Sequence, residues 1–131
     1  MKVVRLADAF EYPVTGHFDM RALRLHNKET SNTVDYTLGL SHFLPGGGTE
    51  YVETGVELIY FILEGEMTVR TKDETIVLKK YDSIHFNVGD GKEIRNETNL
   101  PASMLVIAGN DQGTRHYDPR HRPPGKGRQG L

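Results

Sequence analysis

Cysteine is absent from this chain of 131 residues, which excludes disulfides, thiolate metal sites and a cysteine nucleophile. Long apolar runs are absent too. The opening residues lack the apolar stretch of a signal peptide, and no later stretch approaches the roughly 18 apolar residues of a membrane span. An excess of positive charge is also missing, because 16 Lys and Arg stand against 18 Asp and Glu. We therefore expect a cytoplasmic protein with neither a nucleic-acid partner nor a membrane partner.

What the chain does contain fits one folded domain. Its hydrophobic share of 37% and its aromatic share of 8% are enough for a packed core. Its length is close to the commonest size of a single domain, which leaves almost no room for a second. Without cysteine, any chemistry has to use histidine, carboxylate, lysine, tyrosine or hydroxyl side chains.

Short β-rich runs broken by Gly, Asn and Asp fill the chain from Val34 onward, and no helical pattern is long enough to cover a sheet. Lys72 and Asp73 form a tight connection between two alternating runs, which indicates a hairpin. Closely spaced antiparallel strands usually close into a barrel or sandwich, so the predicted class is all-β. The predicted strands cover residues 34–44, 56–63, 67–71, 74–78, 83–86, 93–96 and 103–108, with a further outer strand at 21–26.

Composition divides the chain into three parts. Residues 1–33 form an N-terminal segment with the outer strand, and residues 34–109 form the barrel. Residues 110–131 are rich in Pro, Gly and Arg and nearly free of apolar side chains, so this tail cannot bury enough surface to fold alone. We expect it to be mobile unless it docks on the barrel or on a partner subunit.

Two segments resemble the paired motifs of the cupin superfamily. PGGGTEYVETGVELIYFILEGE places Gly46 and Gly65 at the two ends of the first motif without a gap, and KYDSIHFNVGDGKEIRN keeps Asp82, Gly89 and Asn96 at the offsets of the second. The resemblance covers residues 34–108. It implies a small, single-domain, RmlC-like cupin, which is an antiparallel double-stranded jelly-roll β-barrel with a cup for a small molecule. It also implies a homodimer.

The positions that hold the metal in most cupins are degenerate here. Where the family carries His, His, Glu and His, this sequence has Val52, Thr54, Leu58 and Lys92. Val and Leu have no lone pair, a Thr hydroxyl is a weak ligand, and an ammonium repels a cation. We therefore expect no metal and no other cofactor.

Unconventional metal ligands are the alternative. A slip of one residue in the loop would present Tyr51 and Glu53 instead of the first two positions. The other surrogate ligands are Glu57, His42 and His85, whose spacing does not place three of them on one face.

Alternation along the strands predicts which side chains line the cup, because successive side chains point to opposite faces. If Leu58 takes the family Glu position, Tyr60 points inward with it, whereas Ile59 and Phe61 point outward and need cover. Either the other sheet or a second subunit would supply that cover. We predict Lys92 and Tyr60 as catalytic residues. The predicted ligand-binding residues are Ser41, Thr54, Glu53, Leu58, His85, Asn96 and Met104, of which Glu53 and His85 lie at the rim.

Some of these side chains also have structural alternatives. His85 lies between apolar neighbours, so an outward position is slightly favoured over the cup. Lys92 could pair with Glu53 instead of serving a ligand, and Tyr60 could be a core aromatic. The remaining histidines, which include His17, are predicted to lie on the surface.

Three functional hypotheses follow. In the first, the protein is a metal-independent enzyme of isomerase, cyclase, lyase or decarboxylase type that acts on a small, anionic metabolite, with a lysine pKa lowered by desolvation. In the second, the barrel binds a small molecule without turnover, with Lys92 as the anchor. In the third, unconventional ligands hold a metal in a divergent lyase or dioxygenase. Because one scaffold hosts many activities, the fold does not choose among them.

Overall fold

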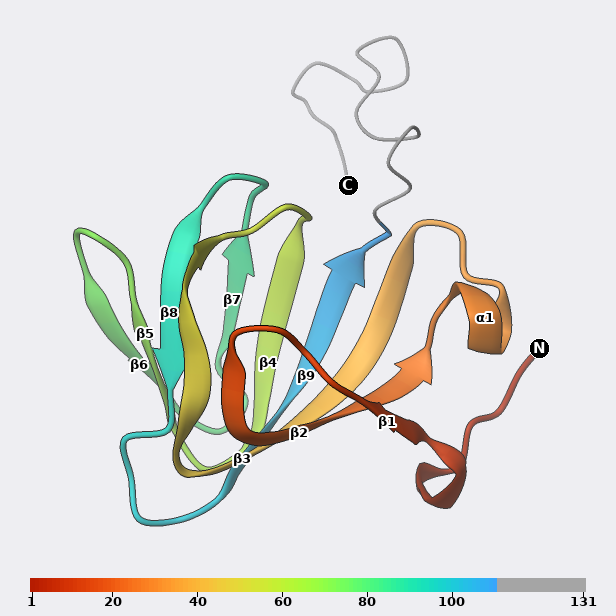
Figure 1. Cartoon of the computed structure of the whole chain (residues 1–131), viewed down its shortest axis with the longest axis horizontal. Coiled ribbons are helices and arrows are strands. Elements are labelled where there is room, and N and C mark those ends of the chain that lie inside the picture. Colours follow the sequence, from red (N-terminus) through yellow and green to blue (C-terminus); the bar gives the residue numbers. More distant parts are fainter. Residues whose placement is uncertain (111–131) are drawn as a thin grey trace, which may run out of the picture.

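A computed structural model describes residues 1–110 as one nearly closed antiparallel β-barrel (Figure 1). The all-β jelly-roll prediction is confirmed, whereas the predicted tail lies outside the described residues except for Asn110. The elements are η1 (Leu6–Asp8), β1 (Phe10–Tyr12), β2 (His17–His26), α1 (Lys28–Ser31), β3 (Tyr36–Glu53), β4 (Leu58–Glu64), β5 (Met67–Arg70), β6 (Thr75–Leu78), β7 (Ser83–Phe86), β8 (Gly91–Arg95) and β9 (Ala102–Gly109).

Strand β3 joins the two halves of the barrel. The strand order is β6-β5-β8-β3-β9-β4-β7, and off this path β2 pairs with β3 and β1 pairs with β2. The first part of β3 pairs with β9, and its last part pairs with β8. The sequence indicated that this strand ends at Leu44, but it runs on to Glu53. Glycine permits β3 to pass close to its neighbouring strands. A Cβ on Gly47 would lie 2.1 Å from the carbonyl oxygen of Asp19, and a Cβ on Gly48 would lie 2.1 Å from the carbonyl oxygen of Ile94.

The core lies between the two halves and follows the predicted alternation. On β4, Leu58, Tyr60 and Ile62 are buried, and on β8 Lys92 and Ile94 are buried. The outward side chains of β4 are more accessible, with Ile59 37% exposed. Period-two alternation therefore assigned the faces of the central strands correctly.

The N-terminal segment contributes more to the barrel than its sequence indicated. Strand β2 begins at His17 rather than at Arg21 and pairs along β3, and the three-residue strand β1 pairs with β2. Strand β1 is too short to show a recognisable alternation. Figure 1 shows this segment crossing the front of the barrel. The described helices are short, and none of them could cross a membrane.

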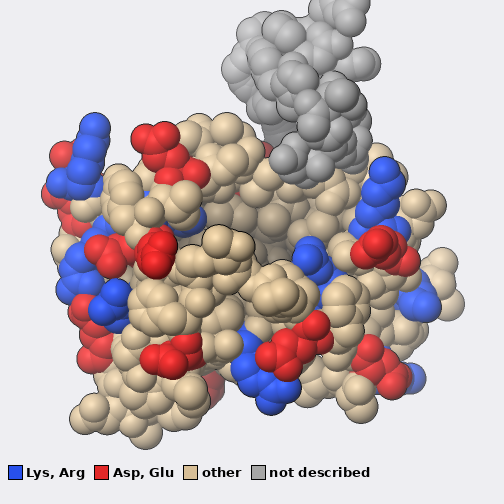
Figure 2. All heavy atoms as spheres, in the orientation of Figure 1, with Lys and Arg blue, Asp and Glu red and all other residues tan. Residues whose placement is uncertain are grey.

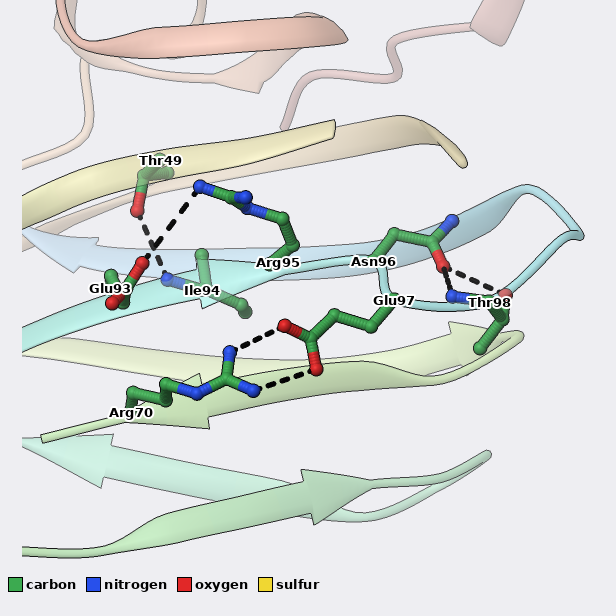
Figure 3. Close-up of polar contacts among 8 residues, drawn as sticks. All are labelled: Thr49, Arg70, Glu93, Ile94, Arg95, Asn96, Glu97 and Thr98. Carbon is green, nitrogen blue, oxygen red and sulfur yellow. Dashed lines mark hydrogen bonds and ion pairs between the residues drawn. The ribbon is translucent and has the colours of Figure 1, made fainter. Parts of the chain in front are cut away.

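A polar turn follows β8, and its side chains are tightly paired (Figure 3). Asn96 is fully buried, and its Nδ2 donates to the carbonyl oxygens of Phe43 (3.3 Å) and Leu100 (2.8 Å). Its Oδ1 accepts from the backbone N–H and the hydroxyl of Thr98, at 3.0 and 2.8 Å. Asn96 therefore fixes the connection between β8 and β9.

An ion pair flanks this turn. Arg70 on β5 reaches the carboxylate of Glu97 with both terminal nitrogens, at 2.6 and 2.8 Å (Figure 3). The fork of a guanidinium matches the two oxygens of a carboxylate, so this pair has the bidentate geometry of strong ion pairs.

Candidate functional site

A cavity of about 190 Å³ opens between the two halves of the barrel, and we call it the cup. It is smaller than the roughly 300–1,000 Å³ of pockets for drug-sized ligands, so it fits a small molecule. No Asp or Glu from the described residues lines it. On the face shown in Figure 2, acidic and basic side chains alternate around a mostly uncharged centre. The lining residues are Tyr12, Val14, His17, Met20, Ala22, Ser41, Phe43, Thr49, Thr54, Val56, Leu58, Tyr60, Lys92, Met104 and Val106.

Lys92 brings a positive charge into the cup. It lies on β8 two residues before the buried Ile94, and only 4% of it is exposed. Its Nζ is 5.6 Å from the ring centroid of Phe86 and 6.0 Å from that of Tyr60, which is the outer range of cation–π contact. No carboxylate of the described chain pairs with it. Burial lowers the pKa of Lys92, because desolvation disfavours the charged form.

Tyr60 supplies a hydroxyl to the same cavity. The residue is 5% exposed, and its ring packs edge-on against Phe86 with centroids 5.4 Å apart. Burial raises the pKa of Tyr60 to about 12, because the phenolate would be poorly solvated. The side chain is therefore neutral at physiological pH and can donate a hydrogen bond to a ligand.

His17 lines the cup as well, which corrects the prediction of a surface position. Counting in steps of two from the buried Ala22 would place His17 outside. The ladder between β2 and β3 is irregular between Phe18 and Met20, and Asp19 there adopts a left-handed backbone with φ of 50°. The left-handed backbone at Asp19 shifts the phase of the strand and turns His17 inward, opposite the buried Thr49. No alternation signal in the sequence marks such a shift.

The polar environment of His17 sets its protonation. Its Nδ1 lies 3.1 Å from the carbonyl oxygen of Thr15, which can only accept, so Nδ1 carries the hydrogen. The pKa of His17 is lowered, mainly by burial and in lesser part by the charge of Lys92, although the bond to Thr15 opposes the shift. His17 is therefore a neutral imidazole. Its Nδ1 is engaged by the Thr15 carbonyl, and its Nε2 carries the lone pair.

Four of the predicted ligand-binding residues do line the cup, namely Ser41, Thr54, Leu58 and Met104. The Thr54 hydroxyl donates to the Val56 carbonyl oxygen at 2.6 Å, which fixes the loop at the rim. The structure thus brings these four together with Lys92 and Tyr60.

Three predicted ligand-binding residues do not lie on the cup wall. His85 points outward from β7, where its Nε2 is 2.6 Å from Glu57 Oε2. Glu53 is exposed at the end of β3, beyond the reach of the cavity. Asn96 does face inward, but its side-chain amide is already hydrogen-bonded within the polar turn and to the β3 backbone. Strand alternation assigns a face, but it does not show whether a polar group is already bonded.

The residues at the metal-binding positions of other cupins do not fit a metal here. Val52, which is 50% exposed, and Leu58, which is part of the core, have hydrocarbon side chains. Neither therefore offers a ligand atom. Tyr51 and Glu53, the pair that a one-residue slip would present, are both exposed. Among residues 1–110, no three His, Asp or Glu side chains gather closely enough to hold an ion.

Residues 39–108, more than half of the chain, match the cupin domain family. This chain is a cupin. It is 34% identical over 106 residues to a β-D-galactosidase of Mycobacterium tuberculosis, which covers 81% of this chain and 91% of that protein.

Solved cupin structures share the fold. The polyketide cyclase RemF of Streptomyces resistomycificus superposes with a TM-score of 0.74 at 20% identity, over 83% of this chain and 79% of that one. A predicted oxalate decarboxylase of Thermotoga maritima gives a TM-score of 0.70 at 19% identity, over 83% of this chain and 98% of that one. Likeness at this level of identity establishes the small RmlC-like barrel and does not identify the reaction.

Proposed function

We propose that this cupin binds and transforms a small ligand with an anionic oxygen group, without a metal, and that Lys92 anchors the ligand. The observation that carries the proposal is the buried ammonium of Lys92, which has no carboxylate partner in the described chain. An unpaired buried charge is costly, and proteins retain such groups mainly where function needs them. A carboxylate or enolate in the cup would satisfy it.

The strength of this anchor comes from the dry surroundings. Charge-assisted hydrogen bonds are about twice as strong as neutral ones, and the apolar wall made by Phe43, Leu58 and Met104 weakens the competition from water. Tyr60 adds a neutral donor next to the cation. A ligand held by Lys92 can therefore also receive a hydrogen bond, which supports a reaction in addition to binding.

Thermal shift measurements with a panel of small acids and neutral sugars test the anchor. We expect formate, acetate, pyruvate and lactate to raise the Tm of the wild type and to have little effect on Lys92→Met, which keeps much of the stem volume. Lys80→Met is the matched control, because Lys80 is an exposed lysine on a surface ion pair with Glu64. A wild type that prefers neutral sugars, or a Lys92→Met variant that responds to acids equally well, would refute the anchor.

Metal independence has its own test. Elemental analysis of protein purified without added metal should find well below one iron, manganese, nickel or zinc per chain, because the family ligand positions carry unsuitable side chains. About one tightly held ion per chain, lost together with activity, would contradict this part of the proposal and favour unconventional ligands.

Hydrolysis of a β-galactoside is a second candidate, favoured by the 34% identical relative. Most glycosidases use two carboxylates that flank the scissile bond, and the described wall of the cup has none. Galactoside hydrolysis here would therefore need another acid–base pair. Release of 4-nitrophenol from its β-D-galactoside, lost in Lys92→Met and kept in Lys80→Met, would support this candidate over an acid-specific cup.

A homodimer also remains a proposal. Ile59 is 37% exposed, and Phe61 beside it is half-buried and stacks on Tyr81 with ring centroids 6.0 Å apart. Their strand pairs them with Ile107 and Leu105 of β9, so the apolar surface continues across two strands. Light scattering should report a dimer at micromolar concentration, and Ile59→Lys should shift it to the monomer. A monomeric wild type would exclude this assembly.

A further inference from the structure

We propose that His17 is the base of the cup, and that it removes a proton from a carbon next to the carbonyl or carboxylate group that Lys92 holds. This inference rests on the proposed anion site, and it names a substrate class, small carbon acids such as 2-oxo acids. It also reassigns the predicted catalytic pair, so that Lys92 stabilises negative charge and Tyr60 donates a hydrogen bond.

The placement of His17 is the first argument. The bulge at Asp19 turns the imidazole into the same cavity that Lys92 and Tyr60 line. The connection between β1 and β2 holds the ring in place, since the Thr15 carbonyl accepts from Nδ1 at 3.1 Å. A histidine fixed through Nδ1 presents Nε2 as its proton acceptor, which is the arrangement that general bases use.

Elimination among the lining residues is the second argument. The described wall has no carboxylate. Tyr60, with a pKa raised to about 12, is a poor base because it stays protonated. Lys92 has to keep its proton to hold an anion, and the hydroxyls of Ser41 and Thr49 are too weakly acidic to ionise. His17 is therefore the one described side chain on the wall with a basic lone pair at neutral pH.

The step balances without another reactant. The Nε2 lone pair of His17 takes the proton, the C–H electron pair forms a carbon–carbon double bond, and the carbonyl π pair moves onto oxygen as an enolate. The ammonium of Lys92 lies where this charge would develop. Return of a proton to the same carbon regenerates the carbonyl, which gives proton exchange with solvent or, at a stereogenic carbon, epimerisation.

His17 also has access to solvent. A wider depression of about 420 Å³ lies outside the cup, and the two spaces share Tyr12, Val14, His17 and Met20. A proton on His17 can therefore exchange with water from that side. This makes the first half of the reaction measurable with a simple carbon acid, even when no further step follows.

Exchange of the methyl protons of pyruvate in D₂O, followed by proton NMR, tests the proposal. We expect the wild type to exceed the same concentration of free imidazole, and His17→Asn to lose about 10²-fold or more, the usual contribution of a general base. Asn keeps a donor near the position of Nδ1 but has no basic nitrogen. His42→Asn, which changes an exposed histidine on the outer face of β3, is the matched control and should exchange as the wild type does.

Binding is measured in parallel, so that the two proposals fail separately. Pyruvate should raise the Tm of His17→Asn as it raises that of the wild type, because Lys92 is intact. If pyruvate binds the wild type without exchange, or if His17→Asn exchanges as fast as the wild type, His17 is not the base and the anion site stands. If no acid on the panel binds, the anion site fails and the role of His17 fails with it.

A measurement on the wild type covers the case in which His17→Asn does not fold. Long-range ¹H–¹⁵N NMR should show the hydrogen of His17 on Nδ1 and a bare Nε2, and pyruvate should shift the Nε2 signal. A hydrogen on Nε2 and a bare Nδ1 would overturn the proposal.

Discussion

Two regions of this barrel bury polar side chains, and they differ in whether those side chains are paired. In the polar turn after β8, Asn96 makes four hydrogen bonds through its side chain, and the neighbouring Arg70 and Glu97 meet in bidentate geometry. In the cup, Lys92 is almost equally buried but has no carboxylate partner in the described chain.

Asn96 uses its hydrogen bonds to stabilise the fold, whereas Lys92 leaves its hydrogen-bonding capacity available for a ligand. A buried polar group with satisfied hydrogen bonds contributes to stability, whereas an unpaired buried charge lowers it. Lys92 therefore reduces the free energy of unfolding and leaves its hydrogen-bonding capacity for a ligand. Substitutions at the two regions should accordingly change stability in opposite directions.

The largest effect is expected from Asn96→Ala. It removes four hydrogen bonds and leaves the buried carbonyl of Phe43 without this donor. The loss in the free energy of unfolding should be about 3 kcal/mol or more, measured by urea denaturation. The folded fraction should still respond to small acids. A loss below about 1 kcal/mol would show that the turn does not depend on Asn96.

Lys92→Met should change the free energy of unfolding in the opposite direction to Asn96→Ala. Removal of an unpaired charge from an apolar cup should raise the free energy of unfolding at neutral pH by roughly 1 kcal/mol, the lower end of what such replacements give. The same variant should lose the response to acids. A lower stability would instead mean that Lys92 has a structural partner, as in the alternative where it neutralises Glu53.

The pH dependence sharpens this comparison. Because folding lowers the pKa of Lys92 below its ordinary 10.5, the unfolded chain binds more protons at this site between the two values, and stability rises with pH there. The destabilisation is fully present below the folded pKa and disappears as pH approaches 10.5. The stability difference between Lys92→Met and the wild type should therefore shrink from neutral to alkaline pH. A constant difference would mean that charge is not its cause.

A smaller effect is expected at the Arg70–Glu97 pair. Both side chains are more than a third exposed, so solvent and salt screen their attraction. In a double-mutant cycle with Arg70→Gln and Glu97→Gln, the coupling should be well below the effect of Asn96→Ala and should fall as salt is raised. A coupling insensitive to salt would indicate that hydrogen-bond geometry dominates over charge.

The smallest effect is expected from His85→Gln. The side chain is exposed on the outer face, where it pairs with Glu57. The free energy of unfolding should change by no more than about 0.5 kcal/mol, and the response to acids should be that of the wild type. Loss of acid binding in this variant would return His85 to the site.

Much of the fold could be predicted because β-strands repeat every two residues. Once Leu58 was assigned a face, the inward position of Tyr60 followed, and the inward position of Lys92 was implied by the resemblance to the second cupin motif. His17 could not be found in this way, since the bulge at Asp19 breaks the period. Asn96 was assigned the correct face and the wrong role, because its hydrogen bonds depend on residues that the fold brings together from β3 and from the turn after β8.

The bulge at Asp19 also bears on how the chemistry of such a cup can change during evolution. If Asp19 instead adopted a regular extended backbone, counting in steps of two from Met20 would turn His17 toward solvent and bring Phe18 to the inner face. A basic wall would become an aromatic one without substitution of any cavity-lining residue. A change of backbone conformation at one position outside the cup is thus a route by which related barrels can gain or lose a proton acceptor, and comparisons that follow only the cavity-lining residues would overlook it.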